Sequence, residues 1–159
     1  MTDNQFLKSY LEDLSNLLKP DDDLIKSLIH IRDLLLEVKS HNKKVLIFGN
    51  GGSASIASHI SVDLTKNTGL RCLNFNEADL ITCFANDYGF EHWVEKAIDF
   101  YGDEGDLLIL ISSSGQSENM LNGVKAARNA NFKSVVTLSG FAKDNPLSQL
   151  GDINLWLDS

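Results

Sequence analysis

Two short apolar runs, each ending in a loop of small polar residues, constrain the fold of this 159-residue chain more than any other feature. Residues 45–48 read Val-Leu-Ile-Phe before a glycine-rich loop, and residues 107–111 read Leu-Leu-Ile-Leu-Ile before a serine-rich loop. Uninterrupted apolar runs of this length are typical of strands buried on both faces. Helical spacing follows each loop, so strands alternate with helices, which predicts a parallel sheet covered on both sides.

The rest of the chain continues this alternation. We expect strands at about 45–48, 70–75, 107–111, 134–138 and 153–157. We expect helices at about 53–66, 77–84, 91–101 and 117–129. The sequence contains no repeat of fixed period and no low-complexity linker, so residues 1–159 are predicted to form a single domain, with an α/β core over 43–159.

Residues 1–42 predict a helical extension, because apolar residues recur there at three- and four-residue spacing. Pro20 and the three aspartates after it are expected to end a first helix and cap a second. The apolar surface of the second helix, over 24–38, is wide. We therefore expect it to be covered by the domain and by another subunit, with packing on this chain alone as the alternative.

Composition excludes several functions. Lys and Arg total 14 against 22 Asp and Glu, and the resulting net charge of −8 disfavours binding to duplex DNA or to an anionic membrane. No apolar run approaches the roughly 18 residues of a membrane span, and the first ten residues do not resemble a secretory signal. Cys72 and Cys83 form no CxxC pattern, so we expect reduced, buried thiols in a cytoplasmic protein.

The glycine-rich loop, Gly-Asn-Gly-Gly-Ser at 49–53, is typical of an anion-binding turn between strand and helix. Glycines permit positive φ, and the free N–H groups and dipole of a helix start bind phosphate without any lysine. A tight turn with no ligand is the alternative. The loop also fits the loose dinucleotide pattern G-x-G-x-x-A, but Asn74 and Asn76 stand where an acidic residue is expected. No Gly-Lys-Ser/Thr follows, which excludes a Walker A loop.

The serine-rich loop, Ser-Ser-Ser-Gly-Gln-Ser at 112–117, predicts a second neutral anion cradle. Ligands of open parallel sheets bind where strands end, and both loops follow strands. Simple helix capping, which needs one hydroxyl, is the alternative. Two cradles at one edge favour a ligand that is phosphorylated and carries many hydroxyl groups.

Two further pairs carry ionisable or amide groups. His59 and Asp63, four residues apart, lie on one face of the expected helix, where they would hold a metal ion or share a proton. The alternative is a partly exposed histidine beside a solvated carboxylate, although Asp63 borders an apolar stripe that includes Ile56. Asn86 and Asp87 lie in a turn-like string that would place an amide and a carboxylate at the sheet edge, but turns use these residues freely.

Three segments together resemble a sugar isomerase (SIS) domain, and within that superfamily the phosphoheptose isomerases. They are GNGGSASIASHISVDL at 49–64, ANDYGF at 85–90 and ISSSGQSENML at 111–121. The resemblance spans essentially the whole chain. It implies a three-layer α/β/α sandwich with a five-stranded parallel sheet, a flavodoxin-like SIS fold. It also implies a homotetramer assembled through the N-terminal helices, 1–42.

The resemblance also implies roles for individual residues. The substrate-binding positions are Asn50, Gly51, Gly52, Ser53, Asp63, Asn86, Asp87, Ser112, Ser113, Ser114 and Ser117. The last four match the loop that grips the sugar phosphate. His59 and Asp63 match positions that bind one zinc ion per subunit, and Asp63 also matches the position of the acid that transfers a proton.

The implied activity is the conversion of sedoheptulose 7-phosphate to D-glycero-D-manno-heptose 7-phosphate through an enediolate. In this reaction Asp63 is the base and zinc stabilises the enediolate charge. The alternative is a non-catalytic SIS module that binds a phosphosugar or a protein partner, as do relatives that associate with the replication initiator. A dinucleotide-binding protein is a weaker third reading, disfavoured by the serine-rich loop.

Two departures from the family pattern affect this prediction. The family has Glu at the position of Asp63, so the reach of the carboxylate is shorter by about 1.5 Å. The family also carries a final helix with a Gln and a His after the last strand, whereas this sequence stops there, and His30, His41 and His92 do not match that His. We expect either a longer native chain or a protein without half of the catalytic pair.

Overall fold

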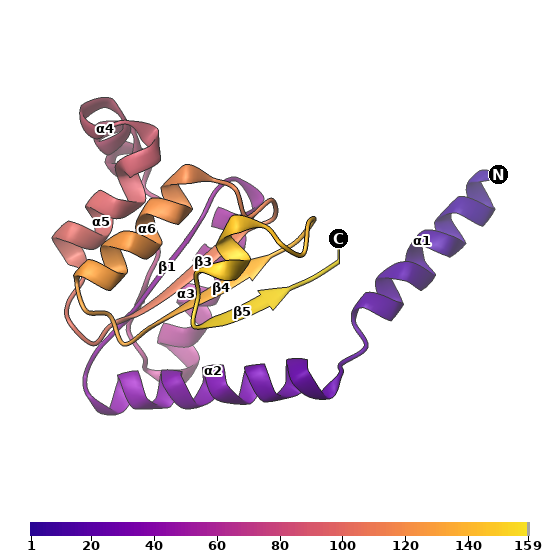
Figure 1. The fold of residues 1–159 in the computed structure, drawn as a ribbon, viewed down its shortest axis with the longest axis horizontal. Helices are drawn as coiled ribbons and strands as arrows, with labels where there is room; N and C mark the ends of the chain where they lie inside the picture. Colours follow the sequence, from indigo (N-terminus) through magenta and orange to yellow (C-terminus); the bar gives the residue numbers. More distant parts are fainter. Residues whose placement is uncertain (159) are drawn as a thin grey trace.

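A computed structural model describes residues 1–158 and contains a five-stranded sheet in the order β2-β1-β3-β4-β5 (Figure 1). The strands are β1 Val45–Gly49, β2 Cys72–Leu73, β3 Leu107–Ser112, β4 Ser134–Ser139 and β5 Ile153–Trp156. All neighbouring strands pair in parallel. The predicted α/β fold with a five-stranded parallel sheet is confirmed.

Helices cover both faces of the sheet, giving the expected three layers (Figure 1). They are α1 Asp3–Leu17, α2 Asp22–Ser40, α3 Gly52–Thr68, α4 Ala78–Tyr88, α5 Trp93–Tyr101 and α6 Glu118–Asn129, with 3₁₀ turns η1 Phe90–His92 and η2 Pro146–Gln149. No helix within residues 1–158 is long and apolar enough to cross a membrane.

Alternate residues of the central strands divide the core into two clusters, as the two-residue period of a strand requires. Leu46 and Phe48 of β1 point to the side of α5 and α6, where Trp93 is 1% exposed. Val45 and Ile47 point to the opposite side, against α2 and α3. Because both faces are apolar, the strands form continuous apolar runs rather than alternating ones.

The N-terminal extension consists of two helices separated where Pro20 and the aspartates predicted a break. The Asp21 carboxylate accepts a 2.7 Å hydrogen bond from the Leu24 N–H and so caps α2. On α2, Leu34 and Val38 pack on the domain, whereas other apolar residues stay exposed. α1 extends away from the body of the molecule and has no buried residue within the described chain (Figure 1).

The helix expected over 77–84 is longer than predicted. α4 continues to Tyr88 and ends at Gly89, whose φ of +93° stops the helix. Asn86 and Asp87 therefore lie in the last helical turn, and the prediction of a turn-like loop there was wrong. Local propensity for turns was outweighed because α4 packs against α5 and η1 through Phe84 and neighbouring apolar side chains.

The two cysteines differ in environment, although both are free. Cys72 is buried, and burial raises the pKa of its thiol to about 12, so it remains protonated and unreactive. Cys83 is exposed on α4, so the expectation that both thiols are buried was wrong for this residue.

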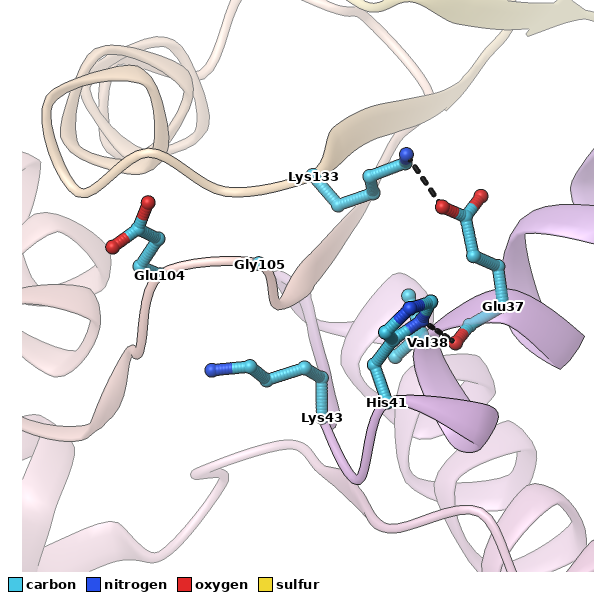
Figure 2. Close-up of a pocket in the computed structure, with 7 residues that line it drawn as sticks. All are labelled: Glu37, Val38, His41, Lys43, Glu104, Gly105 and Lys133. Carbon is cyan, nitrogen blue, oxygen red and sulfur yellow. Dashed lines mark hydrogen bonds and ion pairs between the residues drawn. The ribbon is translucent and has the colours of Figure 1, made fainter.

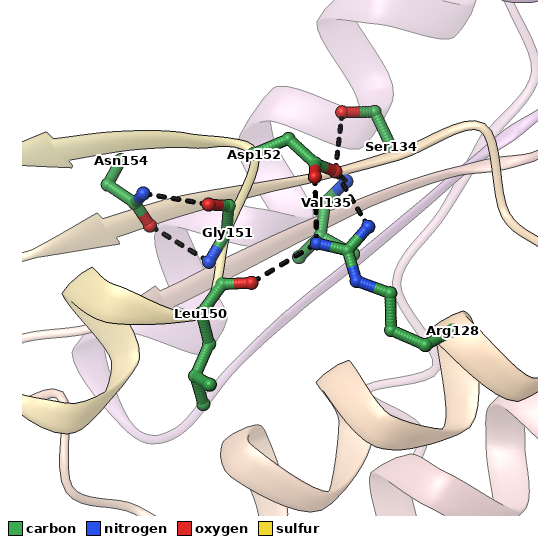
Figure 3. A network of polar contacts seen from close by, with 7 residues as sticks. All are labelled: Arg128, Ser134, Val135, Leu150, Gly151, Asp152 and Asn154. Carbon is green, nitrogen blue, oxygen red and sulfur yellow. Dashed lines mark hydrogen bonds and ion pairs between the residues drawn. The ribbon is translucent and has the colours of Figure 1, made fainter.

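A polar network attaches β5, the last strand, to the rest of the sheet (Figure 3). The Arg128 guanidinium of α6 donates to both carboxylate oxygens of Asp152, at 2.8 and 2.9 Å. The same carboxylate accepts from the Val135 N–H at 2.7 Å and from the Ser134 hydroxyl at 2.9 Å. Bidentate pairing of this kind fixes geometry as well as adding energy, so it holds the start of β5 beside β4.

Candidate functional site

The glycine-rich and serine-rich loops meet at the carboxyl edge of the sheet. β1 and β3 are neighbours, with Gly49 in register with Ile111, so the loops that follow them emerge side by side. Together they line a cavity of about 270 Å³, whose lining is Asn50, Ser53, Ile111, Ser112, Ser113, Ser114, Ser117 and Phe141. Residues predicted independently from two distant segments thus form one polar hollow.

Two glycines of the first loop are required by its shape. Gly51 precedes α3 with φ +54° and ψ −120°, a conformation that favours glycine. A Cβ on Gly49 would lie 2.5 Å from the backbone carbonyl group of Ser53, so any side chain there would displace the start of α3. Gly52 has open space around its Cβ position. Asn50 and Ser53, on either side of Gly51 and Gly52, line the cavity, whereas the two glycines are not among its lining residues.

The hydroxyl groups of Ser112, Ser114 and Ser117 each make a hydrogen bond within the second loop. Ser112 is 6% exposed, and its hydroxyl accepts from the Gly115 N–H at 3.2 Å. Ser114 accepts from the Gln116 N–H at 3.3 Å. Ser117 occupies the N-cap of α6, yet within the described chain its side chain makes no capping hydrogen bond. Simple capping therefore does not explain Ser117, whose hydroxyl lies 3.4 Å from the Ser112 hydroxyl at the cavity wall and has further hydrogen-bonding capacity for a ligand.

Asn145 supports the second loop from below and was missed at the sequence level. This residue is 2% exposed, and its amide donates to the Ser139 hydroxyl at 3.0 Å and to the Ala142 carbonyl at 2.7 Å. It packs so closely beneath Gly115 (φ +62°) that a Cβ there would lie 1.8 Å from its oxygen. The Asn145-Pro146 dipeptide is a turn signal that would have drawn attention to it.

A pair of amides connects the two loops. Asn50 Nδ2 donates to Asn119 Oδ1 at 3.1 Å, and Asn119 Nδ2 donates back to Asn50 Oδ1 at 2.9 Å. Asn119 is 2% exposed in the first turn of α6. It lies inside the segment ISSSGQSENML, but sequence reasoning assigned it no role.

His59 and Asp63 lie on one face of α3, as their spacing predicted, with 3.3 Å between Nε2 and Oδ2. Their side chains are 81% and 54% exposed, and neither lines the cavity formed by the two loops. Ile56, one turn earlier, is 51% exposed, so the apolar stripe is not buried there. In a single copy of the chain these residues match the alternative of an exposed histidine beside a solvated carboxylate.

This pair does not by itself form a zinc site. A catalytic zinc ion uses three protein ligands and one open position. Among the residues that the structure describes, no three His, Cys, Asp or Glu side chains lie close enough together to hold a metal ion. His59 and Asp63 supply two donors of suitable type, so a zinc ion would need at least one more ligand from elsewhere.

Asn86 and Asp87 are not brought to the cavity within one chain. The Asn86 amide donates to the Asp87 carboxylate at 2.9 Å, and the Cys83 thiol lies 3.7 Å from the same carboxylate. Both residues are exposed at the end of α4. Their substrate-binding role remains a prediction.

An apolar cavity of about 330 Å³ adjoins the polar one and shares Ser53, Ile111 and Ser113 with it. It lies between the first turn of α2, Ile56 of α3 and the end of β5, where Trp156 contributes an indole face. The carboxyl edge therefore offers a polar hollow with an apolar neighbour.

A third cavity, of about 340 Å³, lies at the opposite, amino edge of the sheet and contains none of the predicted site residues (Figure 2). Its lysines are on segments that precede β1 and β4, and Lys133 pairs with Glu37 at 2.6 Å. The Lys133 ammonium group lowers the pKa of Glu37. Opposite charges thus neutralise each other here, and we do not assign a ligand to this cavity.

Comparison with known proteins agrees with the predicted family and fold. The SIS domain family model matches residues 5–140. The phosphoheptose isomerase of Helicobacter pylori (strain ATCC 700392 / 26695) is 35% identical over 158 residues, which cover 94% of this chain and 82% of that protein. This chain therefore belongs to the phosphoheptose isomerase family of SIS-domain proteins.

Solved structures give the same assignment. A phosphoheptose isomerase from Francisella tularensis superposes with a TM-score of 0.90 at 28% identity, covering 100% of this chain and 87% of that one. The phosphoheptose isomerase from Neisseria gonorrhoeae superposes with a TM-score of 0.86 at 27% identity, covering 98% of this chain and 84% of that one. The Vibrio vulnificus NanR protein, solved in complex with ManNAc-6P, superposes with a TM-score of 0.68 at 20% identity, covering 96% of this chain and 49% of that one. At this identity the similarity shows the fold alone.

Proposed function

We propose that this protein is an aldose–ketose isomerase that converts sedoheptulose 7-phosphate to D-glycero-D-manno-heptose 7-phosphate. The observation that carries the proposal is the shared cavity of the two loops, which offers hydroxyls, an amide and two helix starts without a formal charge. Such a lining suits a phosphate group and several sugar hydroxyls. From membership of the phosphoheptose isomerase family we infer that the substrate is a seven-carbon sugar phosphate. We also infer that the protein acts in the cytoplasm, in the synthesis of bacterial surface polysaccharide.

The reaction moves a proton between neighbouring carbons, so it needs a base and an acid. Removal of the proton beside the carbonyl gives an enediolate, which is then protonated on the adjacent carbon. Asp63 is our candidate for the base, because its half-exposed carboxylate has room to meet a substrate. We assign none of residues 1–158 to the second proton transfer.

Zinc binding by His59 and Asp63 is part of the proposal but not of the proton-transfer step. A bound zinc ion would polarise substrate oxygens and stabilise negative charge. The two side chains lie 3.3 Å apart and would need a third ligand. The expected result is that His59→Ala lowers the zinc content of the purified protein, measured by mass spectrometry.

A non-catalytic sugar-phosphate-binding module is the second candidate. The observation that favours it is that Asp63, the candidate base, does not line the cavity of the two loops. In such a module the two loops would bind the ligand, and Asp63 would be a solvated surface residue.

One experiment separates the two candidates. The purified protein is incubated with sedoheptulose 7-phosphate in deuterated water, and label in the sugar is followed by nuclear magnetic resonance. An isomerase that uses an enediolate incorporates deuterium, and Asp63→Asn abolishes incorporation while retaining ligand binding. Binding without exchange supports the module instead. Rapid exchange catalysed by Asp63→Asn would remove Asp63 from the mechanism.

We also propose a homotetramer assembled through α1 and α2. These helices expose apolar side chains that a single copy leaves in water, among them Phe6, Leu7, Tyr10, Leu11, Ile25, Leu28 and Ile29. Exposed apolar surface of this extent marks an interaction site. Light scattering over a dilution series should give a mass four times that of the chain. A folded monomer at every concentration would contradict the proposal.

A further inference from the structure

We propose that Asn119 is a positioning residue that selects a sugar hydroxyl through Asn50. The inference rests on the proposed sugar-phosphate function and adds a residue to it. Asn119 is 2% exposed and is absent from the lining of the cavity, whereas Asn50 lines it. Asn119 therefore acts on a ligand only through the amide that it holds.

The two amides fix each other's orientation. Each donates one N–H to the oxygen of the other, at 3.1 and 2.9 Å. Rotating either amide by 180° would place nitrogen against nitrogen and oxygen against oxygen, which would break both hydrogen bonds. Because Asn119 is buried, breaking them would also leave its polar atoms without partners, which adds a desolvation penalty. The pair therefore restricts the Asn50 amide before any ligand arrives, because this amide can turn over only together with that of Asn119.

The pairing with Asn119 leaves part of the hydrogen-bonding capacity of the Asn50 amide unused. A side-chain amide has two N–H donors and an oxygen with two lone pairs. One donor and one lone pair are used by Asn119, so one donor and one lone pair remain, on an amide at the cavity wall. A sugar hydroxyl both donates and accepts, and so satisfies both groups. A phosphate dianion only accepts hydrogen bonds, and it is better served by the hydroxyls and helix start of the second loop.

The amide pair also links segments 69 positions apart in the sequence, one following β1 and the other following β3. The neighbouring polar residue on α6, Asn122, provides a matched control. Its amide donates to the Glu91 carbonyl at 3.0 Å, away from the cavity. Asn→Ala at either position removes the same atoms from the same helix.

The test is a double-mutant cycle measured by calorimetry, with sedoheptulose 7-phosphate and inorganic phosphate as separate probes. We expect Asn50→Ala and Asn119→Ala each to weaken sugar-phosphate binding about tenfold. Combining them should weaken it no more than twofold beyond Asn50→Ala alone, because Asn119 acts through Asn50. Inorganic phosphate should bind every variant within twofold of the unmodified protein, and Asn122→Ala should match it for both probes.

Several results would overturn the inference. Unchanged sugar-phosphate affinity in folded Asn119→Ala protein would do so, as would additive losses in the double variant. Equal weakening of both probes would indicate a general structural role instead. If Asn119→Ala does not fold, Asn119→Ser replaces it, since its hydroxyl is too short to reach Asn50. Failure of the unmodified protein to bind sedoheptulose 7-phosphate would overturn the proposed function, and this inference with it.

Discussion

The two edges of the sheet use polar residues in opposite ways. At the amino edge the Lys44 ammonium lies 2.6 Å from the Asp106 carboxylate, and these side chains are 8% and 1% exposed. At the carboxyl edge the cavity is lined by hydroxyls, one amide and two apolar residues, without an ionisable side chain. Charge is paired and buried at one edge, whereas neutral groups with spare hydrogen-bonding capacity face solvent at the other.

This difference follows from the direction of the parallel strands. α3 and α6 both begin at the carboxyl edge, so their free N–H groups and positive dipole ends are collected there. An anion can be bound at that edge by backbone and hydroxyl groups alone. At the amino edge the helices end, and the chain enters the strands through residues whose charges must be satisfied within the protein. We therefore expect substitutions at the amino edge to change the stability of the protein and substitutions at the carboxyl edge to change its affinity for ligand.

The largest expected effect is at the amino edge. Asp106→Ala leaves the buried Lys44 ammonium without its most enclosed partner and removes the acceptor of the Lys44 and Asp103 N–H groups, at 3.0 and 2.9 Å. Breaking a buried pair in this way costs about 3–5 kcal/mol. Urea unfolding should show this loss, while the affinity of the folded protein for a sugar phosphate changes less than twofold.

Asp103→Ala is the matched control for that prediction. Asp103 contacts the same ammonium at 2.6 Å, but its side chain is 72% exposed. Solvent screens such a pair, so the change in the urea midpoint should be much smaller than for Asp106→Ala. Equal losses for the two variants would show that burial does not decide the strength of these pairs.

The next effect is on ligand binding at the carboxyl edge. Changing Ser114 and Ser117 together to Ala removes two hydroxyls from the cavity wall. We expect sugar-phosphate affinity to fall more than tenfold in calorimetry, equivalent to about 1.4 kcal/mol or more. The free energy of unfolding should change by only about 0.5 kcal/mol per site, since both hydroxyls are partly open to solvent.

Ser40→Ala, on the exposed end of α2, serves as the control for these serines because its hydroxyl contacts only residues outside the cavity: it donates to the Glu37 carbonyl at 2.8 Å and lies 3.3 Å from His41 Nδ1. This variant should leave the affinity for the sugar phosphate unchanged. If the folded double variant of Ser114 and Ser117 bound the ligand as tightly as the unmodified protein, the serine-rich loop would no longer be a candidate phosphate site.

Most of the fold was predictable because local patterns and the core agree. The apolar runs at 45–48 and 107–111 became β1 and β3, and the loops after them met because parallel neighbours end at the same edge. The end of α4 was not predictable. Asn86, Asp87 and Tyr88 have turn propensity, and only the contacts of α4 with α5 and η1 keep them helical.

The candidate site was predicted in part. The serines and glycines of the two loops have sequence signatures because capping and positive φ depend on residue type. Asn119 does not, because its importance lies in a partner 69 residues away. Asn145 stands in a turn signal with Pro146, but that signal does not reveal the loop beneath which it packs. Spacing correctly paired His59 with Asp63, but it gave no information on their exposure, which depends on what covers α3.

The smallest effect concerns another charged group at the amino edge, Asp152, and its dependence on pH. Burial raises the pKa of this carboxyl, but hydrogen bonds from Arg128, the Val135 N–H and Ser134 outweigh burial and lower it overall. Because the pKa in the folded protein is below the unfolded value of about 3.9, the stabilisation is present above that pH. It is lost as the pH falls through the lower, folded-state pKa. Because the Asp152 side chain is 43% exposed, its ionised form should contribute about 1 kcal/mol to the free energy of unfolding at neutral pH.

Asp152→Asn tests this through urea unfolding at pH 7 and at pH 3. The variant should be less stable than the unmodified protein at pH 7. The difference should shrink at pH 3, because this pH lies below the unfolded-state pKa of about 3.9, so Asp152 is largely protonated in the unfolded chain and part of the stabilisation is lost. Asp144→Asn, a substitution of an exposed carboxylate near η2, should leave the pH dependence unchanged. A constant difference between Asp152→Asn and the unmodified protein at both pH values would mean that the network of Figure 3 holds β5 by shape and neutral hydrogen bonds rather than by charge. Charge pairing would then distinguish the two edges of the sheet through the ion pairs of Lys44 and Lys133 and not through Asp152.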